Sequence, residues 1–289
     1  MRKVAFLFTF LLLWNCSAVA LPRVAAVDAV RMNVKDINAE VKFYTDVLGF
    51  QVAKESPGAD GRIRLLLGTE AIELQKYDSK CERTLPADSK SNDLWFQHIA
   101  IVVRDMNEAY QRLQVYGVNR VSPEPQTLPA WNRAAAGIKA FYFQDPEGHN
   151  LELINFPPGK GDPRWQVVTQ QLFLGIDHTA IAVSSTAQSL EFYRGQLGFA
   201  LAGESENWGE EQARLNNVPG AHLKITGLRI PGSFGLEFLE YLSPRNGRVT
   251  PEDACEGDLR NVTTVFTNTS NLSGSFSDPD GHQLVFSAN

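Results

Sequence analysis

The sequence predicts an α+β fold built from four related modules, and three observations support this prediction. Residues 28–50 align without gaps to residues 177–199, and both copies contain Phe-Tyr and Leu-Gly-Phe. The pattern Asp-Pro-acid-Gly-His occurs at residues 145–149 and again at 278–282. Around these motifs, the spacing of apolar residues changes between the period of a helix and the period of a strand.

Each copy of the longer repeat begins as a strand and continues as a helix. Asp36 is the expected N-cap of the first helix, and Gly49 supplies the left-handed residue that ends it. In the second copy, Ser184 or Ser185 is the expected cap. The strand period then returns in each copy, at residues 63–67, 71–77, 221–228 and 235–241. A module is therefore one strand, one helix and about three further strands.

The Asp-Pro-acid-Gly-His pattern predicts a hairpin turn that closes the second and fourth modules. Proline sets the first turn angle, and Gly148 takes the positive φ that lets the strand reverse. We therefore expect His149 and His282 to be turn residues rather than ligands. The second module is predicted to contain a strand, a helix and the closing hairpin, at residues 96–103, 106–116, 138–144 and 150–155.

The fourth module is predicted to be truncated. From His98 to Glu152 is 54 residues, whereas the matching span from Asn261 to Val285 is only 24. That length holds a strand at residues 262–267 and a hairpin around 278–281, but no helix in addition.

Residues 1–20 have the pattern of a secretory signal peptide, with a basic start, an apolar run and a small-residue end at Ala18-Val19-Ala20. We therefore expect an exported protein, periplasmic or secreted; a retained membrane helix is the alternative. The rest is long enough for two domains, expected at residues 21–158 and 173–289 with a linker at 159–172.

Charge and cysteine content limit the partners. The whole chain has a net charge of −6, and removal of Arg2 and Lys3 leaves 25 basic and 33 acidic residues, so 25 − 33 = −8. This charge argues against nucleic acid and anionic membranes as partners. Cys81 and Cys255 leave two alternatives open, one disulfide or two free thiols. Strand edges in the truncated module leave room for a homodimer.

At this point the motifs carry a family resemblance. FYTDVLGF at residues 43–50 and DPEGHNLE at 145–152 resemble the vicinal oxygen chelate (VOC) superfamily. This group includes glyoxalase I, bleomycin and fosfomycin resistance proteins, methylmalonyl-CoA epimerase and extradiol dioxygenases. The resemblance implies two tandem VOC domains, in which paired βαβββ modules form an open cup. It also implies a divalent metal held by the first and last strands of each module.

In the first domain, the resemblance assigns Glu73, His98 and Glu152 as metal ligands, while Ala29 occupies a position where histidine is common. The residues themselves favour this grouping. Each of the three lies in an otherwise apolar strand, where an unpartnered charge would be costly to bury. A shared cation is one partner that would stabilise them, and the water of an open cup is the other.

In the second domain, the resemblance offers His178 and Glu237 as an incomplete site. Asn261 and Val285 occupy the other two positions, and valine cannot bind a metal. A two-histidine, one-carboxylate set is then expected in neither domain, which disfavours dioxygenase chemistry.

The resemblance implies a metal-dependent lyase, isomerase or epimerase that acts on a small oxygenated substrate. Zinc, nickel, manganese and iron all suit the ligands, and the ion would act as a Lewis acid. Glu73 and Glu152 are the expected catalytic carboxylates, with Glu73 as the proton carrier. Loops at residues 131–133 and around Trp208 would form either a substrate lid or ordinary packing. A metal-free binding protein like those of bleomycin resistance, or a purely structural protein, is the alternative.

Overall fold

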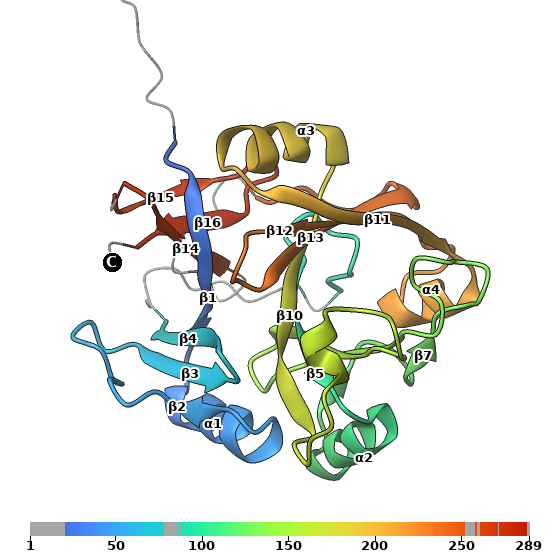
Figure 1. Cartoon of the computed structure of the whole chain (residues 1–289), viewed down its shortest axis with the longest axis horizontal. Coiled ribbons are helices and arrows are strands. Elements are labelled where there is room, and N and C mark those ends of the chain that lie inside the picture. The colour runs from blue at the N-terminus through green and yellow to red at the C-terminus, as the bar shows by residue number, and fades with distance from the viewer. Residues whose placement is uncertain are drawn as a thin grey trace, which may run out of the picture.

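The computed structural model describes residues 21–77, 86, 88–251, 258, 261–270 and 272–287. Within this part of the chain, two sheets form the molecule, and each sheet combines strands from both halves of the sequence (Figure 1). Cys81 and Cys255 lie outside the described residues. The fold is α+β, as predicted.

The seven-stranded sheet joins the first and fourth modules. Its central pair is antiparallel: β1, the blue strand in Figure 1, lies beside β14. The strands in spatial order are β15 (Gly274–Ser277), β16 (Gln283–Phe286), β14 (Val262–Asn268), β1 (Val24–Val34), β4 (Glu70–Lys76), β3 (Ile63–Leu67) and β2 (Gln51–Val52).

The nine-stranded sheet joins the second and third modules. Its central pair is β5 and β10, which are also antiparallel. The strands in spatial order are β11 (Ala200–Trp208), β12 (His222–Arg229), β13 (Gly235–Ser243), β10 (Phe173–Ala182), β5 (Gln97–Val103), β9 (Asn150–Asn155), β8 (Lys139–Gln144) and β6 (Asn119–Arg120), with β7 (Gln126–Thr127) also paired to β8. The modules therefore pair as first with fourth and second with third.

The helices begin where the sequence predicts. Asp36 accepts hydrogen bonds from two backbone N–H groups at the start of its helix, and Ser185 caps the corresponding helix. Gly49 has the expected positive φ of 76°. The helices are α1 (Ile37–Lys42) continued by the π-helix η1 (Phe43–Val47), α2 (Met106–Tyr116), the 3₁₀-helix η3 (Pro163–Gln166), α3 (Thr186–Leu190) continued by the π-helix η4 (Glu191–Gln196), and α4 (Glu210–Asn216). The described residues between β14 and β16 contain no helix, so the fourth module is truncated.

The two repeated motifs meet in space. The Tyr44 hydroxyl donates to Asp145 over 3.1 Å, and the Tyr193 hydroxyl donates to Asp278 over the same distance. Both tyrosines are fully buried. The tyrosine of each Phe-Tyr motif thus holds the aspartate of the hairpin turn that follows in the same half of the chain.

Both histidines of the hairpin pattern are turn residues, as predicted. The backbone N–H of His149 donates to Asp145, and the His149 ring contacts the same carboxylate over 2.8 Å. The His282 backbone donates to Asp278, and its ring nitrogen Nε2 lies 2.8 Å from the Ala182 carbonyl.

The acidic residue within each turn binds the module before it. Glu147 accepts hydrogen bonds from the backbone N–H groups of Lys35 and Asp36, just before α1. Asp280 accepts one from Ser184, just before α3. The repeated turn therefore fastens successive modules together.

One buried apolar cluster runs through both sheets and the helices that cover them. Ile99, Ile101 and Val103 of β5 contribute to it, while His98, Ala100 and Val102 lie on the other face of the strand. None of the helices in the described ranges has the length and apolar character needed to cross a membrane.

Glu40 of α1 is fully buried, and neither of its carboxyl oxygens has a hydrogen-bond partner. Burial, together with the nearby Asp145 and Glu147 carboxylates, raises the pKa of Glu40 from 4.5 to about 9. Between these two values the folded protein holds a proton that the unfolded chain releases. Stability therefore falls as the pH rises through this window.

We predict that Glu40→Gln removes the loss of stability at higher pH, because the amide has nearly the same shape as the carboxyl group and no charge. Between about pH 5 and about pH 8, the unfolding free energy of the wild type should fall by about 4 kcal/mol more than that of the variant, because the unfolded pKa lies below this range and the folded pKa above it. Denaturant unfolding at both pH values measures the difference. Parallel pH profiles for the two proteins would show that Glu40 is ionised in the folded state.

Candidate metal centre

Four adjacent strands bring four polar side chains to one face of the nine-stranded sheet. They are Glu152 on β9, His98 on β5, His178 on β10 and Glu237 on β13. The strand register places alanines between them. Ala100 pairs with both Glu152 and His178, and Ala180 pairs with both His98 and Glu237. These small residues leave room for the larger side chains to converge.

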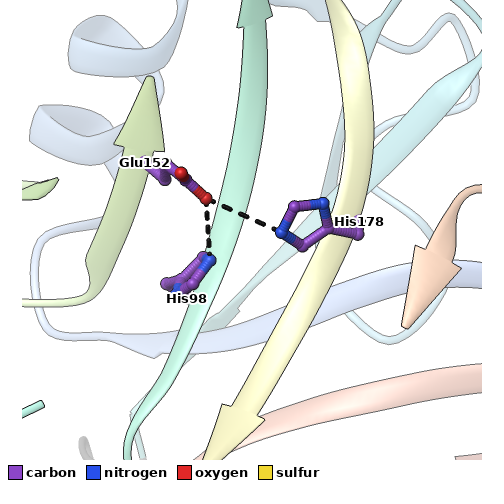
Figure 2. A group of neighbouring side chains, drawn as sticks. All are labelled: His98, Glu152 and His178. Carbon is purple, nitrogen blue, oxygen red and sulfur yellow. Dashed lines mark ion pairs between the residues drawn. The ribbon is translucent and has the colours of Figure 1, made fainter. Parts of the chain in front are cut away.

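The side chains of His98, Glu152 and His178 point toward one another (Figure 2). Glu152 Oε2 lies 3.0 Å from His98 Nε2 and 3.6 Å from His178 Nε2. Potential ligand atoms of all three lie within 4.8 Å of one another. Glu237 Oε1 is 3.7 Å from His178 Nε2 and extends the cluster. Ligands of one divalent ion, each about 2 Å from it, are separated by similar distances.

The cluster is buried, and the nitrogen atoms that face its centre make no well-formed hydrogen bond with the protein. His98 is 1%, Glu152 5% and His178 6% exposed. The Nε2 atoms of both histidines are buried without a hydrogen bond of acceptable geometry. Buried polar atoms of this kind usually have a partner. A divalent cation fits the position, since imidazole and carboxylate ligands suit zinc, nickel, manganese and iron.

A neighbouring carboxylate orients one histidine. Asp177 Oδ2 lies 2.9 Å from His178 Nδ1, which leaves Nε2 directed at the cluster. Asp177 is itself held by the indole N–H of Trp165, over 2.8 Å, and by Arg229, over 3.3 Å. Metal-binding histidines commonly have such a carboxylate on the second ring nitrogen. Trp165 belongs to the segment expected to be a linker.

The pKa shifts favour a charged Glu152 at the centre of the cluster. Burial lowers the pKa of His98, and burial alone would raise that of Glu152. Contacts with His178 and His98 outweigh the burial of Glu152, so its pKa is lowered. Burial would also lower the pKa of His178, but Glu237 and Asp177 raise it well above its usual value. Burial raises the pKa of Glu237 to about 7.

The cluster opens into a cavity of about 320 Å³, which Glu152, His178 and Glu237 help to line. The Tyr142 ring, 4.8 Å from that of His98, forms part of the same wall. Trp131 and Trp208, both expected on loops, lie close together near the cavity, but Trp208 is the last residue of β11 and not a loop residue. The Trp131 and Trp208 rings are 4.0 Å apart, and Asn132 donates a hydrogen bond to Asn207 over 2.6 Å.

The structure does not bring Glu73 to His98 and Glu152, and the expected grouping of these three residues is corrected. Glu73 lies on β4 of the other sheet, because the first module pairs with the fourth and not with the second. There its carboxylate forms ion pairs with Arg31, over 2.9 Å, and with Arg64, over 3.1 Å. Protein cations therefore neutralise Glu73.

The strand registers show which residues in the seven-stranded sheet stand at the positions of the metal-centre residues. Arg31 pairs with Glu73 just as Ala180 pairs with Glu237, so arginine stands where the metal centre has alanine. Arg31 also pairs with Thr263, as Ala180 pairs with His98. Thr263, and not Asn261 as expected, is therefore the counterpart of His98.

Two further counterparts complete this comparison. Ala29 and Val285 replace His178 and Glu152, as the sequence alignment indicates. The equivalent place in the seven-stranded sheet thus has Ala29, Thr263 and Val285 where the metal centre has two histidines and a glutamate.

The expectation that a two-histidine, one-carboxylate set is absent is also wrong. That expectation counted the ligands within each half of the chain. In the structure, β5 and β10 come from different halves and pair directly. Asp177 was not among the predicted site residues. The feature of the sequence that could have identified it is its position next to His178, since a neighbouring carboxylate can accept a hydrogen bond from the histidine ring.

Comparison with known proteins assigns the chain to a family. The profile of the Glyoxalase/Bleomycin resistance protein/Dioxygenase superfamily matches residues 26–153 and 175–249. The chain belongs to this superfamily. The two matched segments fit tandem VOC domains, as the sequence resemblance predicts.

Two relatives match about half of the chain. The 2-epi-5-epi-valiolone epimerase of an Actinomyces species is 32% identical over 158 residues, which cover 48% of this chain and 84% of that protein. The metallothiol transferase FosB of Staphylococcus saprophyticus is 26% identical over 130 residues, which cover 45% of this chain and 76% of that protein.

Among solved structures, glyoxalase I from Zea mays is similar along most of its length. The structural match covers 92% of each chain, with a TM-score of 0.56 and 16% sequence identity. At this identity the likeness shows the fold, and the chemistry of this superfamily member has to be argued from its own residues.

We predict that the His98→Ala, Glu152→Ala and His178→Ala variants each lose most of the bound divalent metal, because each removes one ligand from the cluster. Glu73→Gln is the matched control and should retain the metal, because its carboxylate contacts arginines on the other sheet. Elemental analysis of purified proteins, after equilibration with equal metal, measures both. Loss of metal in the Glu73 variant, with retention in the His178 variant, would contradict this assignment.

Asp177→Asn should weaken metal binding without abolishing it. The change keeps the shape of the side chain but removes the charge that orients His178. Loss of such a contact typically lowers metal affinity by about 10- to 100-fold. Competition with a chromophoric chelator measures the affinity, and an unchanged value would show that His178 is oriented by other contacts.

Proposed function

We propose that this protein is a divalent-metal-dependent isomerase or epimerase, which moves a proton on a small hydroxy-carbonyl compound. The observation that carries the proposal is the cluster of His98, His178, Glu152 and Glu237 at the base of a cavity. When bound, a divalent ion acts as a Lewis acid, which favours the negative charge that develops on a carbonyl oxygen.

Glu237 is the carboxylate that we assign to proton transfer. Its side chain is 24% exposed, compared with 6% for Glu152, and it lines the cavity in which the substrate would bind. Glu152 is enclosed between the two histidines, where it serves as a ligand. Glu237 thus takes the role of proton carrier that the sequence analysis gave to Glu73.

The walls of the cavity support the same chemistry. Tyr142 packs against the His98 ring and limits the movement of that ligand. Leu128, Ile138 and Leu215 cover other parts of the cavity and reduce the water around a charged intermediate. A relative named as an epimerase, 32% identical to part of this chain, is consistent with this proposal.

Two other functions are weaker candidates. A two-histidine, one-carboxylate set also suits iron oxygenases, but these keep positions open for oxygen. Here Glu237, 3.7 Å from His178 Nε2, places a carboxylate beside the cluster, which suits proton transfer better than oxygen binding. In a metal-free binding protein, both buried Nε2 atoms would have only the poorly oriented Glu152 carboxylate as a partner, which is costly.

Export and dimer formation remain predictions from the sequence. Residues 1–20 predict cleavage before Leu21, which N-terminal sequencing of the protein from its host would test. β15 lies at the edge of its sheet, where a second copy could pair, and light scattering would measure the mass in solution.

The proposed reaction predicts metal-dependent exchange of a substrate proton. In D₂O, the metal-loaded protein should catalyse deuterium incorporation beside the carbonyl of a hydroxy-carbonyl compound, as followed by NMR. Glu237→Gln should retain the metal but lower the rate by about 10²- to 10⁴-fold, the usual contribution of a general base.

Glu204→Gln is the matched control, because Glu204 also lines the cavity but pairs with Lys224 over 3.1 Å. Its exchange rate should stay near that of the wild type. Equal rates for Glu237→Gln and the wild type would rule out Glu237 as the base. Absence of metal-dependent exchange across neutral and charged compounds would rule out the proposed reaction.

A further inference from the structure

The cavity combines acidic and amide side chains, and the described residues that line it include no lysine or arginine. Resting on the proposed function, we propose that its substrate is an uncharged compound with several hydroxyl groups beside the carbonyl. We further propose that the cavity rejects phosphate esters and carboxylates of similar size. The charge of the cavity walls, their buried amides and the size of the cavity support this assignment.

The described residues that line the cavity include no lysine and no arginine. Four acidic residues contribute instead: Glu152, Asp177, Glu204 and Glu237. Sites for phosphate or carboxylate groups are normally built with arginine, lysine or a helix N-terminus. The lining therefore lacks the groups that would stabilise an anionic substrate.

A bound metal does not change this conclusion, because its charge is already balanced. Two carboxylates of the centre, Glu152 and Glu237, offset a divalent ion. Asp177 is paired with Arg229 over 3.3 Å, and Glu204 with Lys224 over 3.1 Å. His178 would be a neutral imidazole when bound to the metal, so no surplus of positive charge is left in the lining for a second anion, and burying one would be unfavourable.

Neutral hydrogen-bonding groups are present in the same wall. A row of four buried amides runs from the rim toward α4, with Asn132 donating to Asn207, Asn207 to Gln212, and Gln212 to Asn216. Asn207 is 3% and Gln212 2% exposed, and both line the cavity.

These amides can bind oxygen atoms without adding charge. Each NH₂ group carries a second hydrogen beyond the one used within the row, and each carbonyl oxygen has a second lone pair. Asn207 and Gln212 can thus bind hydroxyl groups, both as donors and as acceptors. Such buried polar side chains are costly unless they are satisfied.

The rest of the cavity limits the size of the substrate. Its volume of about 320 Å³ is at the lower end of the usual range for small-molecule sites. Apolar residues supply much of the remaining lining: Leu128, Ile138, Ile154, Phe156, Leu215 and Ile225. A single short chain or ring fits this space, with oxygens toward the amides and carbon toward the apolar residues.

Matched pairs of probes test the inference: dihydroxyacetone and D-fructose, each beside its own phosphate ester. Binding to the metal-loaded protein is measured by calorimetry, with the phosphate ester and inorganic phosphate run against the metal-free protein to detect direct metal binding. The uncharged member of at least one pair should bind about tenfold or more tightly than its ester, as expected for one uncompensated charge.

Two lysine variants on one loop sharpen the test. Ala134 lines the cavity, whereas Ala136 is not among the lining residues. Ala134→Lys should increase affinity for the phosphate esters, because it supplies the missing cation. Ala136→Lys, the same change outside the cavity, should leave their affinity as in the wild type.

The outcomes separate this inference from the proposed function. Preferred binding of the uncharged compounds, with a gain for esters only in Ala134→Lys, supports the inference. Tighter binding of the esters by the wild type overturns it, as does absence of uncharged binding at about 10 mM, above usual KM values. Metal-dependent proton exchange that acts on esters would preserve the proposed function while overturning the substrate class.

Discussion

The candidate metal centre depends on the antiparallel pairing of β5 with β10. This pairing joins two strands from different halves of the chain and sets Ala180 opposite His98 and Ala100 opposite His178. A shift of one residue would move one histidine to the opposite face of the sheet, into the apolar core. The backbone register is therefore what brings both imidazoles to Glu152.

The repeated turns explain how the halves keep this arrangement. Tyr44 binds Asp145, and Tyr193 binds Asp278, so successive modules are joined through their helices and turns. Strand pairing joins different modules: the first pairs with the fourth in one sheet, and the second with the third in the other. The first and third modules thus each contact one neighbour through their helix and another through their strands, and the metal centre lies where the second and third modules meet.

Much of the fold could be predicted from the sequence because its signals are local. Caps at Asp36 and Ser185, the glycine turns and the missing fourth helix all follow from neighbouring residues. Which modules share a sheet is a long-range property. The sequence analysis placed Glu73 with His98 for that reason, and it kept His178 apart from both His98 and Glu152.

The second sheet shows how a metal position can be replaced by protein charges. Arg31 occupies the place of Ala180 and forms an ion pair with Glu73, so a guanidinium neutralises the carboxylate there. Local sequence reasoning cannot distinguish Glu73 from Glu237, since both lie in similar apolar strands. Only the strand register identifies the side chain opposite each of them.

The most direct test of this account is a crystal structure of the metal-soaked protein, with anomalous scattering recorded at the absorption edge of the metal. The account predicts a single strong peak about 2.0–2.3 Å from Nε2 of His98, Nε2 of His178 and a Glu152 oxygen. A peak at Glu73, or a fully soaked crystal with no peak between β5 and β10, would contradict it.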